Sequence, residues 1–153
     1  MIIAIVMIMA MWFGMRLIPM VQTLDALSLA SGPEYNEVIY HAVHGRWPPA
    51  DNPYMIAGDG KGLYTNNLTL NEGGVITAQL ALSPVSMIGA APFATGAGTI
   101  HGSLSFRPEL LGSRDAPTVS FLCGYAKPVV GRAATSGANK TTLERKFLPP
   151  FCR

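Results

Sequence analysis

The first fifteen residues carry no charged or polar side chain, and this run limits the possible folds more than any other feature of the chain. It extends from Met1 to Met15, and Arg16 is the first charged residue. A helix that is apolar all round has to be buried, either in lipid or among other apolar helices. Fifteen helical residues extend about 22 Å and a bilayer core is about 30 Å thick, so a span would also need the residues up to Val21. The sequence therefore predicts a hydrophobic transmembrane or filament-core helix over residues 1–21.

Two other interpretations of this run stay open, a cleaved signal peptide and a helix buried in a protein core. A signal peptide has a basic segment before its apolar run and a cleavage site of small residues after it. Here no Lys or Arg precedes the run, and no Ala-x-Ala follows it. A retained helix is favoured for this reason, although Arg16 alone gives little information on its orientation in a membrane.

An amphipathic segment follows and is predicted to be helical as far as His44-Gly45, where glycine is the usual stop. Residues recurring at three- and four-residue steps form one stripe, expected to cover a sheet: Leu24, Leu27, Ser31, Tyr35, Val38, Ile39 and Ala42. Gly32-Pro33 interrupts the pattern. The helix either restarts there, because Ser31 and Glu34 have capping-box spacing, or continues with a kink at the proline.

Beyond a loop predicted over residues 45–72, the hydrophobic period changes from 3.6 to 2. Alternating apolar residues predict half-buried strands over 75–82, 99–107 and 118–123. Successive strands without a helix between them favour an antiparallel meander, and residues 83–98 and 128–147 are expected to be loops. The predicted fold class is α+β, with the long N-terminal helix packed on an antiparallel sheet of about four strands. Residues 22–153 would form one globular domain.

The chain has two cysteines, and they are predicted to form a disulfide. Cys123 ends the last predicted strand on its apolar face, and Cys152 is the penultimate residue. Such a bond closes a loop of about 30 residues and stabilises by about 3–4 kcal/mol in the chain-entropy model. It persists only outside a reducing cytosol, so the domain is expected to be extracytoplasmic. The alternative is that both cysteines are free thiols.

Charge is distributed unevenly along the chain. Residues 1–122 hold five basic and eight acidic side chains, whereas residues 123–153 hold six basic side chains and one acidic. The C-terminal region therefore carries +5 against −3 for the rest. A solvated basic tail is the simplest interpretation. The alternative is a surface that contacts DNA or another anion through Lys140, Arg145, Lys146 and Arg153.

No motif in the chain indicates catalysis. The glycines at 58–62 and 96–98 lack the spacing of a dinucleotide or phosphate loop, and the common hydrolase motifs are missing. His41 and His44 are three residues apart on a helix, but no cluster of carboxylates or cysteines accompanies them. The sequence thus predicts a non-enzymatic protein with no cofactor and no metal.

Five stretches together resemble bacterial type IV pilins: residues 26–32, 40–48, 73–80, 121–124 and 146–153. They follow the pilin order over about residues 21–153, and the closing Leu148-Pro149-Pro150-Phe151-Cys152 is the most specific of them. The resemblance implies a structural subunit of a pilus or related filament, used for adhesion, motility or DNA uptake. It further implies partners, namely other pilin subunits, the inner membrane and the pilus assembly machinery.

The N-terminal signals of that family do not appear here. Pilin precursors have a basic leader, a glycine cleavage site and a mature segment with glutamate at its fifth position, and the chain shows none of these. Either the start of the chain is missing, or the chain is a pilin-like protein without the processing signal, which favours a non-polymerising membrane accessory protein. The basic C-terminal loop gives a separate alternative, a minor pilin that binds DNA.

Overall fold

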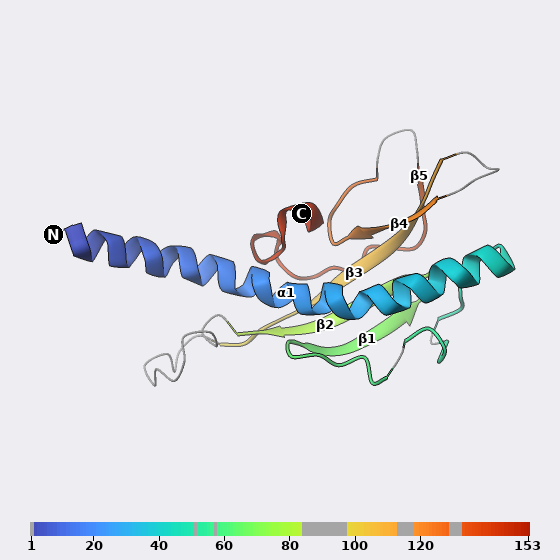
Figure 1. Cartoon of the computed structure of the whole chain (residues 1–153), viewed down its shortest axis with the longest axis horizontal. Helices are drawn as coiled ribbons and strands as arrows, with labels where there is room; N and C mark the ends of the chain where they lie inside the picture. Colours follow the sequence, from blue (N-terminus) through green and yellow to red (C-terminus); the bar gives the residue numbers. More distant parts are fainter. Residues whose placement is uncertain (1, 51, 57, 84–97, 113–117, 129–132) are drawn as a thin grey trace.

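A long helix lies across one face of an antiparallel sheet and extends beyond it at the N-terminal end (Figure 1). The computed structural model describes all residues except 1, 51, 57, 84–97, 113–117 and 129–132. The elements are α1 (Ile2–His44), β1 (Thr65–Asn71), β2 (Val75–Leu82), β3 (Ile100–Leu111), β4 (Thr118–Cys123), β5 (Ala133–Thr135) and two short 3-10 helices, η1 (Arg145–Phe147) and η2 (Pro150–Cys152). The predicted arrangement of one N-terminal helix packed on an antiparallel sheet is confirmed.

Helix α1 runs through both of its prolines, Pro19 and Pro33, as one element. The hydroxyl of Ser31 donates to the carbonyl of Ser28 at 2.7 Å, so it does not cap a new helix. The restart considered at Gly32-Pro33 is therefore wrong. Gly45 ends the helix as predicted, with φ of 66° and its N–H bonded to the carbonyl of His41 at 2.8 Å.

The helix face that meets the sheet is not the predicted stripe. Leu24, Tyr35 and Ile39 are 47, 67 and 47% exposed, and Ser31 and Ala42 are exposed as well. The buried residues of α1 in its sheet-covering part are Pro19, Gln22, Thr23, Ala26, Ala30, Pro33 and Glu37. Ala26 and Ala30 let the backbone of the helix approach the sheet closely. The helix therefore turns its small and polar residues toward the sheet and leaves its larger apolar side chains exposed.

The sheet has the order β1-β2-β3-β4 with antiparallel pairing, which confirms the predicted meander. One row of paired residues crosses all four strands, from Leu70 through Ile76 and Phe106 to Cys123. All four side chains are buried under α1 in the hydrophobic core. The core-facing residues predicted for β2 and β3 are correct, and Cys123 occupies the core face as expected. The opposite face was predicted to be exposed, but Thr77, Ser103 and Ser105 on it are buried as well.

Two predicted loops contain further strands. β1 lies within the predicted loop 45–72, and β5 and η1 lie within 128–147. A register shift between Thr65 and Asn67 interrupts the alternation of β1, so the sequence pattern did not reveal it. β5 pairs with the end of β3, which is longer than predicted and extends to Leu111. The predicted loop 83–98 falls almost entirely outside the described residues.

Within the part of the chain that the structure describes, no helix has both the length and the hydropathy needed to cross a membrane. The transmembrane character predicted for residues 1–21 is not supported. Residues 2–21 and the first part of the predicted globular domain belong to one helix, α1.

Candidate functional site

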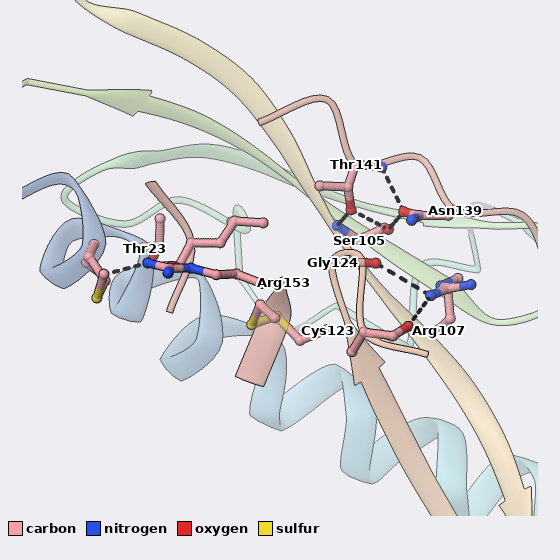
Figure 2. The surroundings of a disulfide bond; sticks show 12 residues. Thr23, Ser105, Arg107, Cys123, Gly124, Asn139, Thr141 and Arg153 are labelled. Atoms are coloured by element: carbon pink, nitrogen blue, oxygen red, sulfur yellow. Dashed lines mark hydrogen bonds between the residues drawn. A yellow bond between two sulfur atoms is a disulfide. The ribbon is translucent and has the colours of Figure 1, made fainter. Parts of the chain in front are cut away.

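The disulfide between Cys123 and Cys152 ties the C-terminus to the end of β4 (Figure 2). The two sulfur atoms are 2.02 Å apart and the two Cα atoms 4.6 Å apart. Both cysteines are part of the hydrophobic core. The predicted disulfide is confirmed, and the alternative of two free thiols is wrong.

Gly124 makes the close approach of these two chain ends possible. Its φ is 59°, and a Cβ atom at this position would collide with the carbonyl oxygen of Cys152. The same carbonyl accepts a hydrogen bond from the N–H of Tyr125 at 2.8 Å. A glycine is therefore required directly after the strand, both for the left-handed backbone and for the missing side chain.

The segment that the disulfide closes passes along the first half of β3. The Ser105 hydroxyl donates to Asn139 Oδ1 at 2.8 Å and lies 2.8 Å from the Thr141 hydroxyl (Figure 2). The Ser103 hydroxyl donates to the carbonyl of Lys140 at 2.5 Å. Both serines are buried, although their positions in the strand pattern predicted a solvent-facing side. In the sequence, the amide and hydroxyl residues at 139–142 indicate that this segment could hydrogen-bond to the serines of β3.

Arg107 holds the start of the same segment. Its guanidinium donates to the carbonyls of Gly124 at 3.3 Å and Ala126 at 2.9 Å (Figure 2). Burial lowers the pKa of Arg107 from its ordinary value, and the nearby Glu109 acts in the opposite direction. A half-buried cation bonded to two carbonyls fixes the turn after β4, so the disulfide is not the only restraint on this turn.

Lys140 lies apart from the other predicted anion-contact residues. Its ammonium donates to Asn71 Oδ1 of β1 at 2.6 Å, across the face of the sheet. Among the described residues, no hydrogen bond or ion pair connects Lys140 to Arg145, Lys146 or Arg153. The four predicted anion-contact residues therefore do not form one connected cluster in the part of the chain that the structure describes.

The remaining three basic residues are exposed on the C-terminal segment to either side of Leu148 in the sequence. The N–H of Leu148 bonds to the carbonyl of Arg145 at 3.1 Å, and its own carbonyl accepts from Arg153 Nε at 2.9 Å. Lys146 forms a 2.6 Å ion pair with Glu144, with both side chains more than half exposed. Such exposed pairs contribute little, so the ion pair leaves the basic character of this surface largely intact.

Two polar residues of α1 fix the helix to one end of the sheet, and sequence reasoning gave neither a role. Oδ2 of Asp25 accepts from the N–H of Tyr64 at 2.9 Å and from both the N–H and the hydroxyl of Thr65 at 3.0 and 2.9 Å. Gln22 exchanges two hydrogen bonds with the backbone of Ser83, at 2.6 and 2.9 Å. These contacts hold the start of β1 and the end of β2. Polar residues in an otherwise apolar helix were the available signal.

An apolar face of α1 is exposed on the side away from the sheet. Its members recur at steps of three, four and eleven residues and are between 45 and 73% exposed: Leu17, Val21, Leu24, Tyr35, Ile39 and Val43. This set is called the outer face of α1 below. Ile5, near the start of α1, is also exposed. Exposed Ser28, Ser31 and Gly32 separate the two groups of the outer face, Leu17 to Leu24 and Tyr35 to Val43. Exposed apolar groups of this kind are typical of a surface that another protein covers.

The two helical histidines pack on aromatic rings. His44 stacks on Tyr40 with ring centroids 4.1 Å apart, and His41 lies against Trp47 at 4.2 Å. Across the described residues, no three His, Cys, Asp or Glu side chains are placed to hold a metal ion.

No protein-family model matches the chain, and no curated protein matches its sequence. The resemblance to type IV pilins therefore stays a prediction that rests on the chain's own residues.

Proposed function

We propose that this chain is a structural subunit of a filament of the type IV pilus kind. The outer face of α1 is the observation that carries the proposal. It is apolar, it is exposed in the single chain, and it lies on the helix that extends beyond the sheet (Figure 1). Burying apolar surface gains about 25 cal/mol per Å², so copies of the chain gain stability by packing these faces together.

The N-terminal part of α1 would lie in the core of such a filament. The sequence there is uncharged up to Arg16 and includes the small residues Ala4, Ala10 and Gly14. Small residues let neighbouring helices approach closely and gain van der Waals contact. Before assembly, the same part would hold the subunit at the inner membrane, with the disulfide-bonded domain on the extracytoplasmic side.

The contacts between α1 and the sheet suit a subunit that is positioned through its helix. Asp25 and Gln22 bind the start of β1 and the end of β2, while the disulfide fixes the C-terminus at β4. The contacts of Asp25 and Gln22 hold the sheet in one orientation relative to α1, and the disulfide keeps the C-terminal segment in place on that sheet. Packing of the helices would then place the sheet domains regularly on the filament surface.

Substitution on the outer face tests the proposal. Leu24→Asp puts a charge on this face, where the side chain is 47% exposed and supports no core contact in the single chain. We expect filaments to disappear from sheared cell-surface material while the thermal unfolding of the isolated chain stays unchanged. Asn66→Asp is the matched control because it adds the same charge at an exposed position of β1. Normal filaments from the Leu24→Asp chain would contradict the proposal.

A second candidate function is anion or DNA binding by a minor subunit. The observation in its favour is that Arg145, Lys146 and Arg153 are all exposed on the segment around Leu148. The third candidate, an accessory protein that does not polymerise, is favoured if the wild-type chain stays monomeric in the membrane fraction.

A further inference from the structure

Glu37 is a fully buried carboxyl group in the C-terminal half of α1. Its side chain is 0% exposed, and neither carboxyl oxygen has a hydrogen-bond partner among the described residues. An ionised carboxylate without a partner is very costly to bury, whereas a neutral carboxylic acid is much less so. Burial at this position therefore favours the protonated, neutral carboxyl group over the ionised carboxylate.

Four segments of the chain meet at this carboxyl group. A Cβ atom placed on Gly74 would lie 3.0 Å from Glu37 Oε2 and 3.2 Å from both Trp47 Cε3 and Pro108 Cγ. Trp47 belongs to the segment after α1, Gly74 to the turn between β1 and β2, and Pro108 to β3. This meeting point is called the Glu37 junction below. The tryptophan and the proline present ring carbon atoms to it, so they offer the carboxylate no stabilisation.

Glu34, one turn earlier on α1, adds a second acidic group. Desolvation raises the pKa of Glu37 to about 9, and the charge of Glu34 contributes to the increase. Burial also raises the pKa of Glu34, to about 7. The charge of an ionised Glu34 therefore adds to the desolvation that keeps Glu37 protonated.

The other charged or titratable side chains of these segments near the junction in sequence are Tyr40, His41, His44, Arg46, Glu72, Arg107 and Glu109. Tyr40 and His44 stack on each other. His41 packs on Trp47. Arg46 and Glu72 are exposed and line a surface cavity of about 550 Å³ next to Trp47. Strand alternation places Arg107 and Glu109 on the face of β3 opposite to Pro108. This arrangement leaves the carboxyl group of Glu37 surrounded mainly by apolar atoms and by Glu34.

We propose that Glu37 controls this junction through its protonation state: the neutral acid lets the end of α1 close on Trp47, Gly74 and Pro108, and ionisation opens the contact. The cavity between residues 46–50 and the turn at 72–73 is the route by which water would reach an ionised carboxylate. The inference is independent of filament formation, because the junction lies within a single chain.

The sign of the pH dependence follows from linkage. Below about pH 4.5, folded and unfolded chains both hold the proton, and the stability of the fold is unaffected by this group. Between about pH 4.5 and 9, Glu37 holds its proton in the folded chain but not in the unfolded chain. The equilibrium constant for unfolding therefore rises by up to about tenfold for each pH unit, and the fold becomes less stable. Glu34 adds a smaller increase that is complete near pH 7.

Urea unfolding of the full chain in a mild detergent, at intervals from pH 5 to 9, tests the proposal. We expect the wild-type midpoint to fall as the pH rises. Glu37→Gln should remove most of the fall, and the remainder should end near pH 7 and disappear when Glu34→Gln is added. Glu72→Gln, an exposed acid beside the same cavity, is the control and should retain the wild-type dependence. Parallel curves for wild type and Glu37→Gln would overturn the proposal.

Opening of the junction itself is measured with Trp47. The chain has two tryptophans, so Trp12→Phe leaves Trp47 as the single reporter. Acrylamide quenching should increase between pH 7 and 9 in this background, and the increase should vanish when Glu37→Gln is added. If Glu37→Gln does not fold, carbon-13 NMR of carboxyl-labelled glutamate in the Trp12→Phe chain decides. A carboxyl that titrates near pH 9 is expected, and ordinary titration of every glutamate would overturn the inference.

Discussion

Gly124 lets Cys152 lie close enough to the end of β4 for the disulfide to form. Gly124→Ala would force a side chain against the Cys152 carbonyl at a φ of 59°. We expect a loss of stability about 1–3 kcal/mol larger than for Gly58→Ala, measured by urea unfolding. Gly58 is the matched control because it has a φ of 74° but no atom near its Cβ position. Equal losses for the two variants would show that the predicted collision is relieved.

Asp25 is the residue that joins α1 to the start of β1. Because its carboxylate accepts three hydrogen bonds from Tyr64 and Thr65, Asp25→Ala should cost about 2–3 kcal/mol in the free energy of unfolding. Asp59→Ala is the control, since Asp59 is exposed and accepts only a local bond from Lys61 among the described contacts. That variant should stay within about 0.5 kcal/mol of wild type. A similar cost at both positions would contradict the role given to Asp25.

At the scale of elements, strands were predicted where one face packs on α1 and the other does not. β2, β3 and β4 follow this rule, so their alternation is visible in the sequence. β1 was missed because a register shift follows Thr65 and because Asn and Thr fill its outward positions. β5 has only three residues, too few for a periodic signal.

The orientation of α1 was not predictable from hydrophobic period alone. Two apolar faces compete on this helix, and the larger side chains lie on the exposed one. Ala26 and Ala30 face the sheet because they permit close packing, a property that hydropathy does not measure. The cysteine pair was predictable because only one intrachain pairing exists. The hydrogen bonds of Asp25 and the surroundings of Glu37 were not, because both depend on segments distant in sequence.

The disulfide-closed segment is the element with the most restraints. Cys152→Ser should lower the free energy of unfolding by about 2–5 kcal/mol, since the bond limits the unfolded chain. Hydrogen bonds from Ser103, Ser105 and Arg107 also hold this segment. We therefore expect the variant to retain the sheet, seen as an unchanged far-ultraviolet circular dichroism spectrum. Loss of that spectrum would show that the disulfide alone maintains the segment.

At the scale of the whole molecule, the separation of charge gives a test of the second candidate function. If the surface around Leu148 binds DNA, three cations would give a log–log dependence of affinity on salt with a slope of about −3. Replacing Arg145, Lys146 and Arg153 with Gln should abolish this dependence, whereas Lys140→Gln, the control, should leave it nearly unchanged. Absence of DNA binding by the wild-type chain at low salt would eliminate this candidate.

The central claim is that copies of this chain assemble through α1. Electron cryomicroscopy of material sheared from cells that express the chain tests it most directly. The account predicts helical filaments in which the N-terminal parts of α1 form the core, the outer face of α1 is buried between neighbours, and the disulfide-bonded sheet domains lie outside. Recovery of the chain only as a monomer, or filaments in which Leu17, Val21 and Leu24 remain exposed to solvent, would contradict it.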